Sequence, residues 1–315
     1  MKIWKTLAQA NDDLIALNTV SAVTIGNFDG VHRGHQMIIK RTVELAKQLF
    51  GQAVVISFTN HTDYFLGHEP PLLNQPAIRK ELLAKLGLDA LLEVEFNHEF
   101  ASLTPETFFE FWLLEGLKAR SVVVGHDFKF GAAGRGNYQL LQQLSMAQKI
   151  ASEQIAAVTE AGQIISSSKI RQLISAGNIE LANKMLGYSF EIKGVVVHGE
   201  QRGRSMGFPT ANIHLESQYL LPAYGVYLVE FIVEGKMFYG VTGVGVKPTF
   251  GINAPLIEVH ILDAALDLYE KEVRVRFLKF LRPEIHFPDA ESLKLQIARD
   301  VEASRSYIEI IRECK

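Results

Sequence analysis

Two histidines three residues apart stand where a short apolar run gives way to a helical pattern. His32 and His35 close the segment 26–35, which follows the strand-like residues 22–25 and precedes apolar positions at helical steps up to Phe50. A helix N-terminus presents free N–H groups and the positive end of its dipole, which suit a phosphate. The two imidazoles share a face of the first turn and can donate to phosphoryl oxygens. The segment predicts a polyphosphate site, the alternative being a simple helix cap; its binding candidates are Gly26, Asn27, Phe28, Asp29 and Gly34.

A second polar segment, 165–171, opens another predicted helix. It reads Ile-Ser-Ser-Ser-Lys-Ile-Arg, so the hydroxyls of Ser167 and Ser168 lie at the helix start and Arg171 lies one turn further on. Hydroxyls, backbone donors and a guanidinium in this arrangement form a phosphate clamp. Taken alone, the serines could be an ordinary N-cap. Together with the first motif they predict the other wall of an ATP site.

Glycines recur every four residues from Gly199 to Gly207, and the sequence continues as Phe-Pro-Thr-Ala-Asn. A loop of this kind can fold over phosphates, assisted here by Arg204. Thr210 and Asn212 are two residues apart, so in an extended segment both side-chain oxygens point to one side. Such hard oxygen ligands suit Mg²⁺ held jointly with nucleotide phosphates. The alternative is a glycine-rich hairpin followed by a strand.

The elements that must position the first two motifs alternate between strand and helix. Apolar runs at 22–25, 53–58, 91–96 and 121–125 predict strands, and helical patterns at 39–50, 76–86 and 105–118 lie between them. This alternation predicts a parallel sheet covered by helices on both faces. Ligands of such sheets bind at the carboxyl ends of the strands, where the helices begin.

From about residue 194 the pattern changes to successive strands. They are expected at 194–198, 225–233, 237–244, 257–262 and 273–280, with a hairpin turn at 234–236 and a final helix that starts near Pro288. Strands in direct succession predict an antiparallel barrel or sandwich. The helical segment that ends near Gly187 sets the boundary, which gives domains of 1–186 and 187–315.

Composition narrows the class of protein. The 315 residues carry a formal charge of −3, and 48 % are hydrophobic, enough to form two cores. No domain is strongly basic, which argues against a nucleic-acid partner. No apolar stretch is long enough to cross a membrane. We therefore expect a cytoplasmic protein with small-molecule ligands. The single cysteine, Cys314, excludes an internal disulfide, and the oligomeric state is left open.

These motifs together resemble those of the bacterial bifunctional riboflavin kinase/FAD synthetases. The first half is similar to nucleotidyltransferases, whose H-x-G-H and Ile-Ser-Ser-Thr-x-Ile-Arg motifs match 32–35 and 165–171. The second half is similar to a flavokinase barrel, whose Gly-Phe-Pro-Thr-Ala-Asn signature stands at 207–212. The resemblance implies two activities. The second half would phosphorylate riboflavin with ATP to FMN, and the first half would transfer AMP from ATP to FMN, giving FAD and pyrophosphate.

The resemblance also implies roles for particular residues. In the kinase, Glu258 would be the base for the ribityl hydroxyl, and Thr210 and Asn212 would hold the Mg²⁺ that accompanies ATP. Arg282 matches the family and would contact flavin or nucleotide, unless it forms an ordinary ion pair. In the adenylyltransferase, His32, His35 and Arg171 would stabilise charge on the phosphates, and Asp127 carries over from the family's flavin-binding segment.

Departures from the family pattern affect both halves. Where many members have Phe-x-Pro-His-Pro, this chain has Asn60 and Thr62 in place of the prolines, so a less rigid loop is expected. Ser168 replaces a threonine and keeps the hydroxyl. Gly243 stands where many members have asparagine. Three alternatives stay open: an adenylyltransferase with a weakened kinase, a flavin-binding regulator without turnover, and a nucleotidyltransferase of another pathway.

Overall fold

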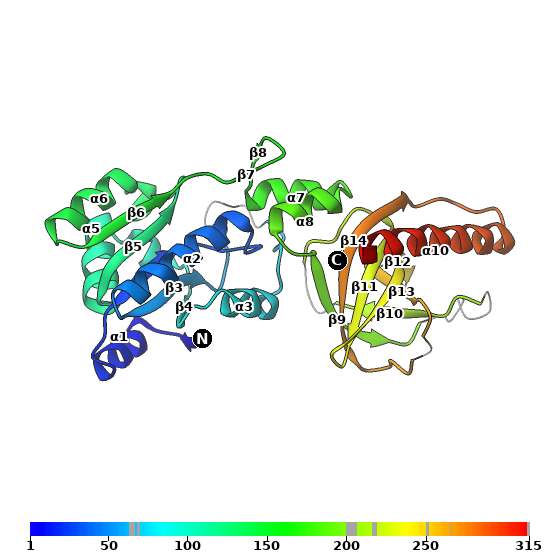
Figure 1. Cartoon of the computed structure of the whole chain (residues 1–315), viewed down its shortest axis with the longest axis horizontal. Coiled ribbons are helices and arrows are strands. Elements are labelled where there is room, and N and C mark those ends of the chain that lie inside the picture. Colours follow the sequence, from blue (N-terminus) through cyan, green and yellow to red (C-terminus); the bar gives the residue numbers. More distant parts are fainter. Residues whose placement is uncertain are drawn as a thin grey trace. The chain divides into compact units, whose positions relative to one another are not determined.

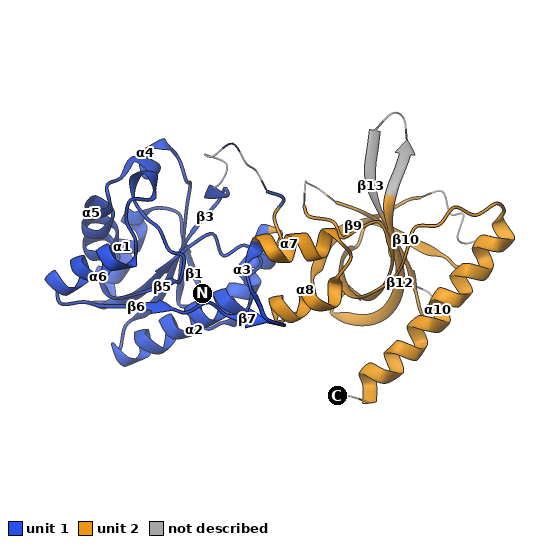
Figure 2. Ribbon diagram, turned by 90° about the horizontal axis from the view of Figure 1, so that it is seen from above, with its two compact units in different colours: residues 1–71, 76–167 blue, residues 72–75, 168–315 orange. Residues whose placement is uncertain are grey.

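The structure, a computed structural model, describes residues 1–62, 67, 70–199, 207–215, 219–249, 252–264 and 266–313. By packing, the chain divides into two compact units (Figure 2). The first comprises Met1–Pro71 and Pro76–Ser167, and the second comprises Leu72–Gln75 and Ser168–Lys315. The motif at 26–35 thus lies in the first unit and the motif at 199–212 in the second, while the segment 165–171 crosses the division.

The first unit, which Figure 1 shows, is built on a parallel sheet. Its six strands lie in the order β1-β4-β3-β2-β5-β6. Its four central strands are the apolar runs that the sequence predicts. The two edge strands were not predicted, because one has only three residues and the other is polar. The strands are β1 (Lys2–Trp4), β2 (Ser21–Ile25), β3 (Gln52–Phe58), β4 (Ala90–Val94), β5 (Ala119–Gly125) and β6 (Ala151–Ile155).

Helices cover both faces of this sheet, because alternate side chains of each strand point to opposite sides. On β2, Val23 packs into one core and its neighbour Ala22 into the other. The predicted α/β fold is confirmed. One face carries α1 (Leu7–Ala16), the π-helix η2 (Phe108–Gly116) and α6 (Tyr138–Ala147), and the other carries α2 (Arg33–Gln48) and α3 (Pro76–Lys85).

The order of the strands reverses at β2, which has β3 on one side and β5 on the other. The connections that follow β2 and β5 therefore lead away from each other. In open parallel sheets, ligands bind in the crevice that such a reversal creates at the carboxyl edge. The topology thus brings the turn at 26–32 and the segment 125–127 to the carboxyl edge of the sheet, where the strand order reverses.

The helix predicted over 105–118 has two parts. One short turn, α5 (Pro105–Thr107), continues into the nine-residue η2. Phe108 and Leu113 are five residues apart and both are buried, which the wider π-helical turn allows. Gly116 lies against Leu7 of α1, whose side chain a Cβ would overlap. Such π-helical stretches are rare and occur often at functional sites.

The second unit is a closed antiparallel barrel in the order β10-β13-β12-β11-β14-β9 (Figure 1). Five of its strands match the predicted runs, and β10 is the extended segment that carries Thr210 and Asn212. Of the two predicted folds, a barrel and a sandwich, the barrel is therefore confirmed. The strands are β9 (Glu191–Val197), β10 (Thr210–His214), β11 (Gly225–Val233), β12 (Lys236–Thr249), β13 (Ile252–Ile261) and β14 (Glu272–Pro283).

A 24-residue helix, α10 (Ala290–Glu313), packs on the outside of this barrel. Its Ile308 joins Leu228, Val241 and Leu262 in a small apolar cluster. The helix begins two residues after Pro288, as the sequence predicts. Across the part of the chain that the structure describes, α10 included, no helix is both long and apolar enough to cross a membrane.

The predicted boundary at 186/187 follows a helix, α8 (Ile179–Leu186), which Gly187 ends with a left-handed backbone (φ 80°). This helix packs in the second unit, since the Asn183 side chain donates to the Phe277 carbonyl of β14 at 2.8 Å. The preceding helix, α7 (Ser167–Ser175), also continues into that unit. The compact second unit therefore begins before the predicted boundary, and the division of the two activities at 186/187 stays a prediction.

A short segment from much earlier in the chain completes the second unit. Leu72 forms a β-bridge with Tyr219. The Gln75 side chain exchanges two hydrogen bonds of 2.8 Å with the backbone of Lys193. The second unit is thus assembled from two separate stretches of sequence.

Candidate active sites

His32 is the N-cap of α2, and its position fixes where its proton lies. Its Nδ1 accepts the backbone N–H of His35 at 3.3 Å. A nitrogen that accepts carries no proton, so the neutral ring keeps its proton on Nε2. Gly34 allows this arrangement, because a Cβ there would lie 3.2 Å from the His32 ring.

The two imidazoles of the motif are stacked. The ring centroids of His32 and His35 are 3.6 Å apart with an interplanar angle of 18°, and Phe28 presents its edge to the His35 ring. Burial lowers the pKa of His32 to about 4, although the nearby Asp127 carboxylate acts in the opposite direction. Burial and the neighbouring His32 hold the pKa of His35 well below its usual range. Both rings are therefore neutral at pH 7, and each has one N–H to donate.

The depressed pKa predicts how the first unit responds to acid. An unfolded histidine titrates near 6.5 and folded His32 near 4, so between these values only the unfolded chain binds this proton. His32 should thus contribute about 3 kcal/mol of stability above pH 6.5, lost as the pH falls to about 4. Urea unfolding followed by tryptophan fluorescence measures this, because Trp4 and Trp112 are the two tryptophans of the chain and both lie in the first unit.

The control is His32→Asn, which keeps a good N-cap side chain without a group that titrates. The wild-type protein should lose more stability than this variant between pH 6.5 and 4.5. Equal losses in the two proteins would contradict the assignment of a depressed pKa to His32.

The turn that precedes α2 has an unusual backbone. Phe28, Gly30 and Val31 have φ angles of 48°, 81° and 34°. A positive φ is uncommon for side chains other than glycine and is costly for a β-branched residue such as Val31. Phe28 and Val31 are buried in the core beneath α2. Strain of this kind persists only where the surroundings hold it, which is frequent at ligand sites.

The second sequence motif meets this turn through one hydrogen bond. The Ser167 hydroxyl donates to the Asp29 carbonyl at 2.8 Å, within the first unit. Ser167 is also the first residue of α7, so the start of that helix lies beside the turn at 26–32. Arg171 lies one turn further along α7, on the face that carries Ser167. Ser168 and Arg171 already belong to the second unit.

The end of β5 contributes the residue that was carried over from the family's flavin segment. The Asp127 side chain is 82 % exposed and lies close enough to His32 to affect its pKa. Gly125 permits the approach of α2, because a Cβ there would lie 3.3 Å from the Ile38 side chain. The structure thus brings Asp127 to the first motif.

Aromatic rings gather next to this edge of the sheet, beginning with Phe128 and Phe130, which follow Asp127 closely in the sequence. Those two rings stack at 5.4 Å. They join a cluster at the ends of β3 and β4 in which ring edges meet ring faces. Its other members are Phe58, Phe96, Phe100, Phe108 and Trp112.

The loop after β3, expected to be less rigid without its prolines, is held by side-chain hydrogen bonds. The Asn60 amide donates to the Phe96 carbonyl at 3.0 Å and accepts the Phe96 N–H at 2.8 Å. Asn27 of the phosphate turn donates to the Thr62 hydroxyl at 2.9 Å. The residues that replace the prolines therefore fasten the loop at two points.

In the second unit the register of the strands brings three predicted residues together. Asn212 on β10 is paired with Glu258 on β13, and Thr210 is paired with His260. Side chains of directly opposed residues lie on the same face with Cβ atoms about 5 Å apart. Glu258 is half-buried, and beside it on β12 lies Gly243, where a Cβ would meet nothing within 4 Å. The Glu258 carboxylate therefore lies next to open space.

Gly199 has a specific reason to be glycine. A Cβ at this position would overlap the Asn212 side chain, which is 93 % buried beneath it. Gly207 adopts a left-handed backbone (φ 87°) just before the Phe-Pro-Thr-Ala-Asn segment. His260 supports that segment, since its Nδ1–H donates to the Pro209 carbonyl at 2.9 Å. Arg204 lies outside the described residues.

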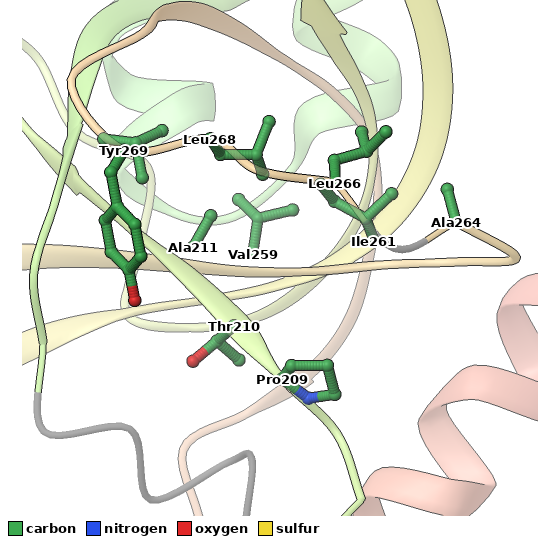
Figure 3. A pocket seen from close by; sticks show the side chains of 10 residues that line it. Pro209, Thr210, Ala211, Val259, Ile261, Ala264, Leu266, Leu268 and Tyr269 are labelled. Atoms are coloured by element: carbon green, nitrogen blue, oxygen red, sulfur yellow. The ribbon is translucent and has the colours of Figure 1, made fainter.

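A pocket of about 320 Å³ opens beside Thr210 (Figure 3). Its walls combine aliphatic side chains with the Tyr269 ring and the Thr210 side chain. The His198 ring stacks on Tyr269 at 3.8 Å. A cavity of this volume falls within the range of small-molecule sites. Its lining is Val196, Pro209, Thr210, Ala211, Val259, Ile261, Ala264, Leu266, Leu268 and Tyr269.

Arg282 forms an ion pair rather than standing free at a site. Its Nε lies 3.0 Å from both carboxylate oxygens of Asp300, and its Nη2 lies 2.8 Å from one of them. Both side chains are largely buried, so the pair fastens β14 to α10. The ion pair that was given as the alternative for Arg282 is thus present in the structure. Contact with flavin or nucleotide stays a prediction.

Comparison with known protein families gives two matches in the expected order. The model of the FAD synthetase family matches residues 15–169. The model of the riboflavin kinase family matches residues 186–308. The two matches cover most of the chain and leave 170–185, which holds most of α7 and α8, between them.

Relatives match along nearly the whole chain. The bifunctional riboflavin kinase/FMN adenylyltransferase of Listeria monocytogenes is 36 % identical over 94 % of this chain and 94 % of its own length. The protein of the same name from Escherichia coli K12 is 37 % identical over 90 % and 92 %. A crystal structure described as a macrolide-efflux protein from Streptococcus pneumoniae has a TM-score of 0.86 at 29 % identity and covers 97 % of this chain and 99 % of that one. On these grounds the chain belongs to the bifunctional riboflavin kinase/FMN adenylyltransferase family.

Proposed function

We infer that this enzyme makes FAD from riboflavin in two ATP-dependent steps, with a separate site for each. In the first step the second unit transfers the terminal phosphoryl group of ATP to the ribityl hydroxyl of riboflavin. In the second step the first unit transfers AMP from ATP to the phosphate of FMN and releases pyrophosphate. Membership of the family supports both steps. The observation that carries most weight in this chain is the pairing of Asn212 with Glu258 in the barrel.

For the kinase step, Glu258 is the proposed base. A half-buried carboxylate beside the open space at Gly243 can accept the proton of a hydroxyl placed there. Phosphoryl transfer depends largely on positioning and charge stabilisation, so one such base and a fixed nucleotide are what the site must supply. Gly243 widens the space next to Glu258 in comparison with an asparagine.

Two residues of β10, the strand that pairs with the Glu258 strand, fit a magnesium ion. Thr210 and Asn212 offer hydroxyl and amide oxygens, which Mg²⁺ prefers, and the absence of a Cβ at Gly199 gives the Asn212 side chain its place. When bound with ATP, the ion would neutralise phosphate charge. The pocket that Thr210 borders would take the adenine ring, because the base must lie within reach of phosphates held at Thr210.

For the adenylyl transfer, the proposed donors are His32, His35 and the N-terminus of α2. Neither reactant needs a covalent link to the enzyme, so the work is to orient the two phosphates and stabilise charge on the α-phosphate and the departing pyrophosphate. Neutral imidazoles donate N–H groups without bringing a charge that must be desolvated. Ser167, Ser168 and Arg171 are proposed to bind the nucleotide phosphates from the start of α7.

The aromatic cluster and Asp127 are proposed to receive the flavin of FMN. The rings at the ends of β3 and β4 offer the flat apolar surface that an isoalloxazine needs. A cytoplasmic location and the lack of nucleic-acid and membrane partners stay predictions from the sequence.

One time course tests both activities. Purified protein is incubated with riboflavin, Mg²⁺ and ATP, and the flavins are separated by chromatography at intervals. FMN should appear first and FAD after it. FMN without FAD would contradict the adenylyltransferase, whereas FAD formed only when FMN is supplied would identify an enzyme with an inactive kinase. Flavin that binds and stays unchanged would favour a regulator.

The Asn60 hydrogen bonds give a further prediction for the first unit. In Asn60→Ala the Phe96 backbone loses two partners, so the aromatic cluster loses part of its support. Loss of two hydrogen bonds of about 1 kcal/mol each predicts a KM for FMN raised by about 10-fold or more. Steady-state kinetics at saturating ATP measure this value. Thr59→Ala, at the adjacent exposed residue, is the control and should leave this KM within about twofold; an unchanged KM in Asn60→Ala would contradict the prediction.

A further inference from the structure

A buried arginine lies behind the two loops that surround the proposed adenylyltransferase site. Arg79, on α3, is 93 % buried. Its Nη1 donates to the carbonyl of Asn27 at 3.2 Å, and its Nη2 donates to the carbonyl of Phe58 at 2.9 Å. Asn27 belongs to the phosphate turn that precedes α2, and Phe58 opens the loop that follows β3. One guanidinium therefore holds a backbone carbonyl of each loop.

The two carbonyls belong to segments that need an external support. Asn27 directly precedes the turn in which Phe28 and Val31 have positive φ angles. Its carbonyl accepts a second hydrogen bond, from the Ser57 hydroxyl at 3.2 Å. Phe58 leads into the loop in which hydrogen bonds replace the family's prolines. The backbone strain of the turn requires fixed partners, and Arg79 is one of them.

The charge of Arg79 is costly to bury and is compensated locally. Burial lowers the pKa of this guanidinium, against the attraction of Glu93 and Asp29. Glu93 on β4 is itself buried, lies 3.6 Å from Arg79, and also pairs with Lys80 at 3.0 Å and with Lys5 at 2.6 Å. Apolar residues of similar volume commonly serve stability as well as such a buried pair does. The geometry of the two carbonyls, rather than stability alone, accounts for an arginine here.

A lysine cannot make the same contacts. A guanidinium is planar and directs its N–H groups in a fixed fork, so its two terminal nitrogens reach two acceptors at once, whereas an ammonium is a compact point charge on a flexible chain. The arginine therefore contacts the phosphate turn and the end of β3 at the same time, in addition to the hydrogen bonds of Asn27 with Ser57 and Thr62.

We propose that Arg79 is a positioning residue of the adenylyltransferase, which fixes the ATP-binding turn and the flavin-side loop relative to each other. This proposal rests on the function proposed for the first unit. Adenylyl transfer requires the FMN phosphate to be aligned with the α-phosphate of ATP, and a displacement of about 1 Å at such a site costs on the order of 10²-fold in rate. Arg79 acts only through the two loops and touches neither reactant in this assignment.

The test compares Arg79→Met, Arg79→Lys and Lys80→Met in the full-length protein. Arg79→Met should lower kcat for FAD formation from FMN by about 30- to 100-fold and raise the KM of both ATP and FMN. Arg79→Lys should recover only part of the loss. Lys80→Met removes an ion pair of the same Glu93 but no loop contact, so its kinetics should stay within about threefold of the wild type. Riboflavin phosphorylation by the second unit should stay within about twofold in all three variants.

The outcomes distinguish a positioning role of Arg79 from an effect of its substitution on folding alone. A variant that folds poorly has fewer active molecules, which lowers kcat but leaves both KM values unchanged; that result for Arg79→Met would overturn the proposal. Equal effects of Arg79→Met and Lys80→Met would also overturn it, since the charge network would then be the cause. Addition of guanidinium ion to Arg79→Ala should restore part of the activity, and failure of this rescue together with unchanged KM values would count against it. Wild-type protein that forms no FAD from FMN would contradict the proposed function instead.

Discussion

Glutamine in place of Glu258 is expected to lower the rate of riboflavin phosphorylation by about 10³-fold. The carboxylate and its amide have nearly the same shape, but only the carboxylate can take the proton of the attacking hydroxyl, and a general base of this kind contributes about 10²- to 10⁴-fold. The β10–β13 register that pairs Glu258 with Asn212 should be preserved. The loss should therefore appear in kcat, with the KM for ATP almost unchanged. Initial rates of FMN formation measure it.

Two comparisons make this result specific. FAD formation from added FMN should continue at the wild-type rate in Glu258→Gln, because that reaction belongs to the first unit. Glu272→Gln, which changes an exposed glutamate of β14 paired with Lys193, should leave both reactions within about twofold of wild type. A kinase rate reduced less than tenfold in Glu258→Gln would remove Glu258 as the base.

Alanine in place of His35 is expected to lower adenylyl transfer by about 10²-fold or more. The argument is the removal of one preorganised hydrogen-bond donor from a site where negative charge develops. The structure adds a second reason, because His35 stacks on His32 and contacts Phe28, so its loss also frees the ring of His32. Conversion of FMN to FAD with ATP in excess, followed as release of pyrophosphate, measures the effect.

The exposed His98, outside the stacked pair, provides the matched control. His98→Ala should keep both activities, and His35→Ala should keep riboflavin phosphorylation. Near-normal turnover of FMN in His35→Ala would refute the role of this imidazole, whatever its effect on stability.

The sequence predicted those parts of the fold and the site in which the signal is local. Continuous apolar runs identified β2 to β5, and spacing placed His32 and His35 on one helical turn. Edge strands escaped prediction because β1 has three residues and β6 is polar. The π-helical form of η2 also escaped, since apolar residues five apart do not stand out from an ordinary helical pattern in so apolar a segment.

Contacts between distant segments could not be predicted from one sequence. Arg79 reads as one more charged residue on a predicted helix, and nothing around it in the sequence indicates that its partners are carbonyls at positions 27 and 58. Asn60 presents the same difficulty, because its partner is the backbone of Phe96. The missing prolines were visible as a departure, but their replacement by hydrogen bonds follows only from the packing of β3 beside β4.

The segment Leu72–Gln75 determines what happens when this enzyme is divided into its two halves. A cut after Leu186 would separate Gln75 from the Lys193 backbone and Leu72 from Tyr219, so a released C-terminal fragment would lack part of its own structure. A single genetic crossover at that point, which replaces one catalytic half by that of another protein, would remove the same contacts. A stand-alone kinase derived from this chain would therefore need Gln75 to be supplied in trans or its lost hydrogen bonds to be replaced.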